Sequence, residues 1–322
     1  MKIRSFLCVI LSALVSLGAS ATQAESVIRL GHFPNVTHVQ ALVAHHLSRQ
    51  GKGWFEQRLG PDVKIEWYIY NAGPSAMEAV FANSIDVTYV GPSPAINAFA
   101  KSLGQEVRIV AGAANGGAAL VIQPDSTIKT GADFRGKRIA TPQLGNTQDV
   151  ACRAWLRSQG LKITQMGGDA QVLPTANPDQ LSLFAQKKLD AVWTVEPWVS
   201  RLERDANGKV FLEEKDSVTT VLVSSVKFQQ EHREELRKLV AAHKELTEWI
   251  KAHPVEAQAM AVAELSDEMK SKISPELIAA AWKRIELTNE VSVDSLKTFV
   301  THAQEAGFLK QVPDLGILVQ IP

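Results

Sequence analysis

Short apolar runs alternate with amphipathic stretches along most of the chain. The apolar runs predict strands over residues 27–31, 63–70, 85–91 and 107–113. Between these runs, apolar residues recur at helical spacing over residues 39–50, 74–83 and 93–103. Strands that alternate with helices indicate parallel βαβ units, so the pattern predicts an α/β fold.

The same order of elements recurs in the second half of the chain. The segments "AGPSAMEAVFANSID" and "ANPDQLSLFAQKKLD" both run Ala-x-Pro and place an Asp 12 residues after the Pro. The matched pairs are Pro74 with Pro178, Asp86 with Asp190 and, more loosely, Arg29 with Arg138 and Thr37 with Thr147. Any one pair could arise by chance, but their common order predicts two structurally similar α/β lobes.

Two crossings between the lobes are expected. We assign residues 25–120 and 222–322 to lobe I and residues 121–221 to lobe II, because an apolar strand leads into a polar linker near 116–126 and another apolar strand returns over 218–225. The two crossings predict a two-strand hinge with a ligand cleft between the lobes. The C-terminal part shows amphipathic helical patterns, expected to pack around lobe I, at 231–253, 255–265, 275–287 and 292–306.

The first 24 residues have the pattern of a secretory signal peptide. Lys2 and Arg4 precede an apolar core over 6–17, and the small-residue segment "GASATQA" follows. Cys8 lies inside that core, which argues against a lipoprotein anchor, and no later stretch reaches about 18 apolar residues. We therefore predict a soluble exported protein. Its mature part keeps only Cys152, so no internal disulfide forms.

The charge balance narrows the choice of partners. The chain has 34 basic and 34 acidic residues, which gives a formal net charge of zero. A neutral chain has no electrostatic footprint for nucleic acid or for an anionic membrane. We therefore expect neither as a partner.

Four turns should meet in the cleft, because ligands of open parallel sheets sit beyond the carboxyl ends of the strands. The turns are 33–38, 71–76, 91–95 and 142–147. Each combines Gly or Pro with Ser, Thr or Asn and precedes a helix, whose N-terminus favours an anion. Neutral donors of this kind suit a weakly basic oxyanion such as a sulfonate. In the alternative interpretation, Ser75, Ser93 and Thr147 only cap their own helices.

Catalytic and metal-binding patterns are weak. Cys152 falls in a helical stripe with Trp155 and Leu156, which favours a buried apolar role over a nucleophile. His38 and His45 share nearly one helix face, but zinc would need an i, i+4 pair with a third ligand, and no HExxH occurs. The sequence also has no GxSxG, no Walker lysine and no Rossmann GxGxxG. We therefore predict no catalytic residue, no metal and no cofactor.

The segment "VWTVEPWVS" is the least neutral candidate for the cleft. A carboxylate at Glu196 would repel an anion unless it accepts a hydrogen bond from the ligand or pairs with a protein cation. Trp198 could cover an apolar tail of the ligand. An equally good interpretation makes Glu196 a helix-start carboxylate beside a packed tryptophan.

Taken in order, these motifs resemble a known family. The segments "LGHFPNVTH", "NAGPSAMEA", "GPSPAI", "ADFRGKRIATPQLGNTQD" and "DAVWTVEPW" are similar to those of periplasmic substrate-binding proteins from ABC importers of the nitrate, taurine and aliphatic sulfonate group. The resemblance implies a type II periplasmic-binding fold that closes around a small anionic solute. It also implies a monomer that delivers this solute to an inner-membrane ABC permease with its ATPase.

The resemblance also implies a set of ligand-binding residues. Carried onto this sequence, they are Asn35, Thr37, His38, Ser75, Ser93, Asn146 and Thr147, with Trp198 lining the cleft and Glu196 as a departure from a purely anion-binding pattern. The expected function is binding of a small organosulfur oxyanion, namely an aliphatic sulfonate, taurine or a sulfate ester. Alternatives are nitrate, bicarbonate or another small solute. A remoter one is an enzyme like the thiamine-precursor synthases, which would predict a cysteine-rich iron site.

Overall fold

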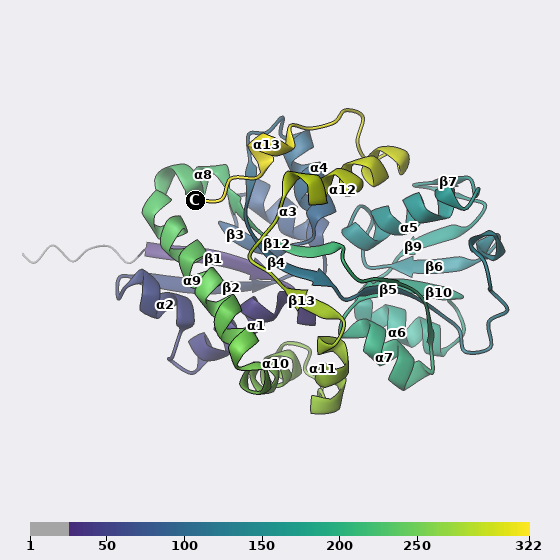
Figure 1. Cartoon of the computed structure of the whole chain (residues 1–322), viewed down its shortest axis with the longest axis horizontal. Helices are drawn as coiled ribbons and strands as arrows, with labels where there is room; N and C mark the ends of the chain where they lie inside the picture. The colour runs from purple at the N-terminus through teal and green to yellow at the C-terminus, as the bar shows by residue number, and fades with distance from the viewer. Residues whose placement is uncertain (1–25) are drawn as a thin grey trace, which may run out of the picture.

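Two β-sheets divide the chain into two lobes in the computed structural model, which describes residues 26–322 (Figure 1). The predicted signal peptide, residues 1–24, lies outside the described residues. The first sheet has the order β13 (Ile285–Leu287), β4 (Val107–Gly116), β12 (Val218–Ser225), β3 (Val87–Val90), β1 (Ser26–His32), β2 (Val63–Ile69). The second has the order β11 (Lys209–Glu214), β5 (Ala118–Ile122), β10 (Ala191–Val195), β6 (Arg138–Thr141), β9 (Gln171–Pro174).

The two sheets have the same topology. In the first, β1 runs parallel to β2 and β3, and β12 joins β3 in antiparallel fashion. In the second, β6 runs parallel to β9 and β10, and β5 joins β10 in antiparallel fashion. The chain crosses between the sheets from β4 to β5 and from β11 to β12, a few residues before the lobe boundaries expected from the sequence. The predicted pair of α/β lobes joined by two crossings is confirmed.

The sequence repeat is also a repeat of contacts. The backbone N–H and the Nε of Arg29 donate to Asp86 Oδ2 at 2.8 and 3.0 Å. Arg138 makes the same two bonds to Asp190 Oδ2, again at 2.8 and 3.0 Å. Each pair ties the central parallel strand of its sheet, β1 or β6, to the residue just before the strand beside it, β3 or β10. The two lobes therefore share a local contact pattern as well as an order of strands.

Helices cover both sheets. In sequence order those of the lobes are α1 (Val39–Arg49), α2 (Trp54–Leu59), α3 (Gly73–Phe81), α4 (Pro92–Lys101), α5 (Thr147–Ser158), α6 (Asn177–Ala185) and α7 (Trp198–Ala206). Short 3₁₀ turns, η1 (Val36–His38) and η2 (Gly131–Phe134), and a small hairpin of β7 (Ile163–Thr164) and β8 (Gly167–Gly168) complete them. None of the helices within 26–322 combines the length and apolar character needed to cross a membrane.

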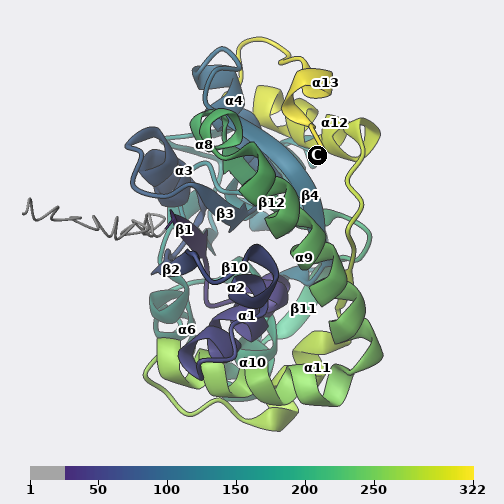
Figure 2. The ribbon, with the colours of Figure 1, turned by 90° about the vertical axis from the view of Figure 1, so that its left-hand side faces the viewer.

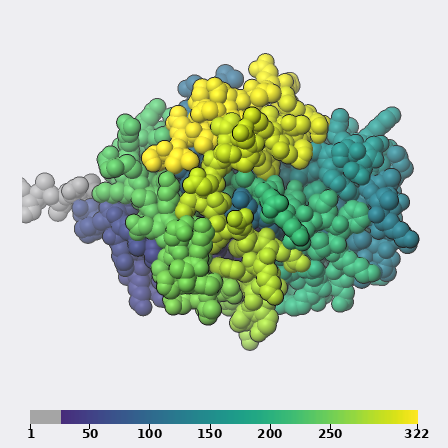
Figure 3. All heavy atoms as spheres, viewed as in Figure 1, coloured from purple at the N-terminus to yellow at the C-terminus, as the bar shows by residue number. Residues whose placement is uncertain are grey.

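The C-terminal part is mainly helical. It contains α8 (Val226–Glu231), α9 (Arg233–Ala252), α10 (Pro254–Glu268), α11 (Pro275–Trp282), α12 (Val293–Glu305) and α13 (Leu315–Leu318). Helices α9, α10 and α11 share one apolar core with the first sheet, and Figure 2 shows α9 and α10 running past α1 and α2. Helix α12 contacts α4 and also α5 of the second lobe, so the yellow C-terminal residues reach both lobes in Figure 3.

One predicted helix is shorter than expected. The amphipathic pattern over 275–287 predicted a single helix, but α11 ends at Trp282 and residues 285–287 form β13. This strand pairs antiparallel with the free edge of β4. The pairing satisfies backbone groups of both strands, and such a long-range contact overrides a local helical pattern.

Candidate functional site

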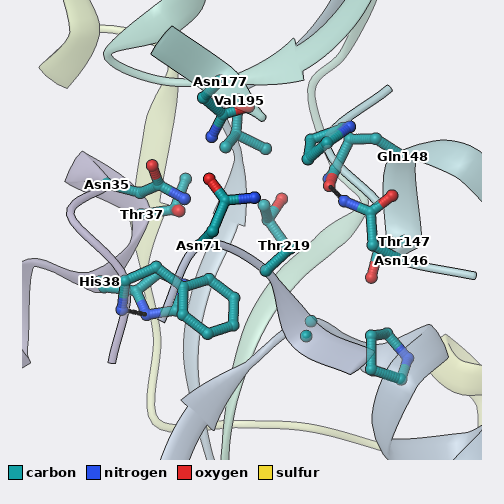
Figure 4. A pocket seen from close by; sticks show the side chains of 16 residues that line it. Asn35, Thr37, His38, Asn71, Asn146, Thr147, Gln148, Asn177, Val195 and Thr219 are labelled. Atoms are coloured by element: carbon teal, nitrogen blue, oxygen red, sulfur yellow. Dashed lines mark hydrogen bonds between the residues drawn. The ribbon is translucent and has the colours of Figure 1, made fainter. Parts of the chain in front are cut away.

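A small cavity lies between the lobes, beyond the ends of the parallel strands (Figure 4). All four turns predicted from the sequence contribute to its wall. Among its described lining residues none is Lys, Arg, Asp or Glu, and His38 is the one titratable side chain. The cavity measures about 20 Å³, which is room for about one water-sized group. In this closed arrangement the space suits a compact polar group rather than a long chain.

Four helices begin at this cavity. Gly73 of α3, Pro94 in the first turn of α4, Thr147 of α5 and Asn177 of α6 all line it. The N-cap residues of α3, α4 and α6 make no side-chain cap bond. The first backbone N–H groups of a helix have no partner within that helix, and the helix dipole adds partial positive charge. Prolines remove some of these donors, so that only Ser93 keeps an N–H among the first three residues of α4. The wall therefore favours an anion without using a charged side chain.

The three hydroxyl groups that could have been simple helix caps do not act as caps. Ser75 Oγ donates to the carbonyl of Ala72 at 2.9 Å. The buried hydroxyls of Ser93 and Thr147 find no hydrogen-bond partner among the described residues. Only Thr147 lines the cavity, whereas Ser75 and Ser93 lie outside its lining. Of these three hydroxyls, that of Thr147 therefore has both a position in the cavity wall and a free donor for a ligand.

Asn146 does cap its helix. Its side-chain oxygen accepts from the backbone N–H of Asp149 at 2.8 Å, and its amide donates to Gln148 Oε1 at 3.1 Å. Gly145 turns the chain just before this cap with a φ of 78°, a conformation that favours glycine. The side chain of Asn146 still lines the cavity, so it supports the turn and forms part of the wall.

A buried ion pair between Asp149 and Arg153 holds the same turn in place. Asp149 accepts from Gly145 N–H at 2.9 Å, from the Thr141 hydroxyl at 2.9 Å and from Arg153 Nε at 3.0 Å. Both side chains of the pair are at most 1% exposed. Asp149 thus neutralises the positive charge of Arg153 inside the second lobe. The guanidinium is not among the groups that line the cavity.

Hydrogen bonds orient two asparagine amides in the wall. Trp198 Nε1 donates to Asn35 Oδ1 at 3.2 Å, and the Thr194 hydroxyl donates to Asn177 Oδ1 at 3.2 Å. In each case the amide oxygen is occupied, so the NH₂ group is left as a donor. Trp198 is buried and does not line this cavity, but it borders the larger opening beside Asn71 and Asn177. Because Asn35 belongs to lobe I and Trp198 to lobe II, this bond also joins the lobes.

His38 is a neutral donor. Its ring is fully buried, and this burial holds its pKa well below the usual value. The Phe33 N–H donates to His38 Nδ1 at 3.3 Å, which places the ring proton on Nε2. An uncharged ring with one N–H adds to the same set of neutral donors.

Glu196 lies outside the cavity lining and has protein partners of its own. Its Oε1 accepts from Arg284 at 2.9 Å and from the Ser200 hydroxyl at 2.9 Å, and its Oε2 accepts from Ser200 N–H at 3.0 Å. Burial raises the pKa of this carboxyl, and the bonds from Ser200 and Arg284 oppose the rise. Arg284 connects α11 to β13 in lobe I. Two options left open by the sequence are both observed: Glu196 pairs with a protein cation, and it accepts the Ser200 N–H in the first turn of α7 beside the buried Trp198. The ion pair spans the two lobes.

Sequence reasoning missed four polar lining residues: Asn71, Gln148, Asn177 and Thr219. The repeat could have identified Asn177, because it aligns with Gly73 and both occupy the first position of a helix at the cavity. Asn71 belongs to a predicted turn and points toward the centre of the cavity in Figure 4. Thr219 comes from strand β12, and its position depends on a long-range strand pairing that has no local signal.

Comparisons with known sequences agree with this architecture. A profile of the NMT1-like family matches residues 21–266. A protein of Escherichia coli (strain K12) named for binding aliphatic sulfonates is 30% identical over 203 residues, which make up 61% of this chain. The match spans 59% of the length of that relative.

Solved structures show the same fold. The alkanesulfonate-binding protein SsuA of Xanthomonas axonopodis pv. citri, bound to MOPS, is 19% identical with a TM-score of 0.75, covering 93% of this chain and 100% of that one. The nitrate-binding protein NrtA of Synechocystis PCC 6803 is 16% identical with a TM-score of 0.69, covering 88% of this chain and 82% of that one. The predicted periplasmic-binding fold is thereby confirmed.

Proposed function

The chain belongs to the NMT1-like family, and from this premise we propose that it is the solute receptor of an ABC importer. It binds a small organosulfur oxyanion, namely an aliphatic sulfonate, taurine or a sulfate ester, in the periplasm. It then delivers this solute to an inner-membrane permease with its ATPase, without chemically changing it.

The cavity between the lobes carries this proposal. Four helix N-termini and the donors of Asn35, Thr147 and Asn177 face one small space whose described lining has no charged side chain. Each N-terminus contributes on the order of 0.3 to 1 kcal/mol toward an anion, and more when partly buried. A sulfonate is ionised at any biological pH and presents three oxygens that only accept hydrogen bonds. A sulfonate therefore needs hydrogen-bond donors, and the cavity wall mainly provides donors.

Contacts between the lobes support a receptor that closes on its solute. Asn35 of lobe I accepts from Trp198 of lobe II, and Val36 N–H donates to the carbonyl of Glu196 at 3.0 Å. A Cβ added to Gly91 of lobe I would lie 2.2 Å from the Thr147 hydroxyl of lobe II. The absence of a side chain at Gly91 therefore lets the two lobes meet around the cavity.

Nitrate is the second candidate. The volume of about 20 Å³ favours a very compact anion, and the nitrate-binding protein NrtA shares the fold. Nitrate also presents three acceptor oxygens to the same donors. A sulfonate with an organic tail requires the cleft to widen or the tail to pass between Asn71 and Asn177, which border a larger opening.

A thermal-shift screen of the purified mature protein tests the proposal. The ligands are methanesulfonate, taurine, a sulfate ester, nitrate and bicarbonate, the last with and without calcium. A ligand at 100 times its dissociation constant stabilises the protein by about 2.7 kcal/mol. A shift with nitrate alone replaces the leading candidate with the second, and no shift with any of these oxyanions contradicts the proposal.

A pair of matched variants shows whether the cavity is the site. Asn177→Asp places a carboxylate in the wall with almost no change in shape, and it should abolish the shift by repelling the anion. Asn83→Asp makes the same change at an exposed position of lobe I and should leave the shift unchanged. If both variants lose the thermal shift equally, or if neither loses it, the anion binds elsewhere.

A further inference from the structure

A buried cluster of histidines and glutamates lies in lobe I, outside the cavity lining. His32 ends β1, His45 lies on α1, and Glu264 and Glu268 lie on the last turns of α10. His32 Nε2 lies 2.6 Å from Glu268 Oε1, which in turn lies 3.1 Å from His45 Nδ1. Glu264 Oε1 lies 2.9 Å from the same His45 nitrogen. The two imidazoles and the Glu268 carboxylate thus place one ligand atom each within 4.8 Å of the others, and Glu264 lies beside His45.

The cluster is almost fully withdrawn from water. The side chains of His32, Glu264 and Glu268 are at most 1% exposed, and that of His45 is 14% exposed. Glu268 Oε2 finds no hydrogen-bond partner among the described residues. Burying carboxylates is costly unless a positive charge compensates them. Glu264 and Glu268 therefore need a cation close by.

The protein cations nearby cover only part of this need. Arg49 NH1 lies 3.2 Å from Glu264, but this guanidinium is 46% exposed and is shared with Asp267. His45 Nδ1 faces oxygens of both Glu264 and Glu268, although a ring nitrogen carries one proton at most. His32 Nε2 can donate to Glu268 Oε1 and His45 Nδ1 to Glu264, but Glu268 Oε2 still has no partner among the described residues. A divalent ion bound between the two imidazoles and Glu268 would supply the positive charge that this buried carboxylate needs.

We propose that His32, His45 and Glu268, with Glu264 beside His45, form a binding site for one divalent transition-metal ion of the zinc type. Imidazole nitrogens and carboxylate oxygens are ordinary zinc ligands, with bonds of about 2.0–2.2 Å. Tetrahedral bonds of that length place ligand atoms about 3.3 Å apart. Glu268 Oε1 lies 2.6 Å from His32 Nε2 and 3.1 Å from His45 Nδ1, and all three ligand atoms lie within 4.8 Å of one another, so side-chain adjustments can bring them to this spacing. Glu268 and the neighbouring Glu264 also offset the charge of the ion.

The ion would tie the C-terminal helices to the part of lobe I that carries the cleft. Helix α10 packs along α1, and the cluster joins both helices to the end of β1. His32 immediately precedes Phe33, which lines the cavity, and Glu268 borders the larger opening beside Asn71. Metal binding would therefore stabilise the frame of the cleft without entering it.

Local spacing could not reveal this site. In the sequence, His38 and His45 offered no i, i+4 pair with a third ligand, which led to the expectation of no metal. Glu268 lies 236 residues after His32. Only the packing of α10 against α1 brings them together.

The test uses the untagged mature chain after treatment with a chelator. Zn²⁺ alone is titrated by calorimetry, and Co²⁺ alone is followed by the visible absorption of its four-coordinate complex. We expect one ion per chain and a rise in melting temperature. His45→Gln and Glu268→Gln should each weaken Zn²⁺ binding at least about tenfold, and His253→Gln, at an exposed histidine on the same lobe, should not.

Each outcome bears on the proposal. If the wild-type chain binds no Zn²⁺, or binds it equally well after His45→Gln and Glu268→Gln, the site does not exist. If one variant fails to fold by circular dichroism, the Co²⁺ spectrum of the wild-type chain decides. Absorption typical of a four-coordinate site supports the proposal, and the spectrum of hydrated Co²⁺ overturns it.

Discussion

Replacing Arg284 by methionine should destabilise the protein by about 3 kcal/mol at pH 7. The change leaves the buried Glu196 carboxylate without its cation, and breaking a buried ion pair from one side costs about 3–5 kcal/mol. Two hydrogen bonds from Ser200 remain, which favours the lower end of that range. The Glu196 carboxyl can also become neutral by binding a proton, which removes the unpaired buried charge. Protonating a carboxyl of ordinary pKa 4.5 costs about 3.4 kcal/mol at pH 7. The loss of stability in the variant therefore cannot exceed about this value.

The same reasoning predicts the sign of a pH dependence. Burial raises the pKa of Glu196 above its unfolded value, so the native state binds more protons than the unfolded state. Stability therefore falls as pH rises, and more steeply once Arg284 is gone. At pH 5 the limiting cost of protonation is only about 0.7 kcal/mol. The loss caused by Arg284→Met should thus shrink markedly between pH 7 and pH 5.

Urea unfolding at both pH values measures this effect. Arg237→Met serves as a matched control, because Arg237 pairs with Glu234 on an exposed face of α9 and should contribute little. In the double variant with Glu196→Gln, most of the loss should disappear, since no charge is left unpaired. A loss below about 1 kcal/mol at pH 7, or one that does not change with pH, would refute the reasoning.

Three further predictions concern other buried groups. His243 is fully buried, which lowers its pKa to about 4; stability should fall by up to about 3 kcal/mol from pH 7 to pH 4, and a His243→Gln variant that shows the same fall in urea unfolding would contradict this. Burial raises the pKa of the Cys152 thiol well above its usual value, so iodoacetamide should modify it in urea but not in the native protein, as mass spectrometry can show. Thr147→Val should weaken oxyanion binding by about 0.5–1.5 kcal/mol and Ser75→Ala should not, and calorimetry that gives equal affinities for both would remove Thr147 from the site.

The architecture was predictable because its signals are local and repeated. Alternating strand and helix patterns, and an Asp that follows each Pro at the same distance, indicated two similar lobes. The resulting kinship with substrate-binding proteins of the nitrate, taurine and sulfonate group is confirmed. Strand β13 was missed because its pairing partner, β4, lies far away along the chain. The buried state of Cys152 was predicted from its place in an apolar stripe and is confirmed.

The turns that form the site could be predicted from the sequence, but the directions of their side chains could not. Helix starts can be recognised from Gly, Pro and Asn, and all four predicted turns reach the cavity, although the start of α6 at Asn177, which also lines it, was not among them. The direction of a side chain depends on its partners across the lobes. Trp198 turns to Asn35 and Glu196 turns to Arg284, and neither partnership has a signal in the local sequence.

Calorimetric titration of the tightest-binding oxyanion from the screen, repeated from pH 6 to pH 8, tests the central claim most directly. The claim is that neutral donors and helix N-termini hold the anion. Burial keeps the pKa of His38 well below its usual value, so no described group in the cavity wall changes charge over this range. We predict one anion per chain and a dissociation constant that does not change with pH. An affinity that falls about tenfold per pH unit would mean that a protonated group holds the anion, and would contradict the account.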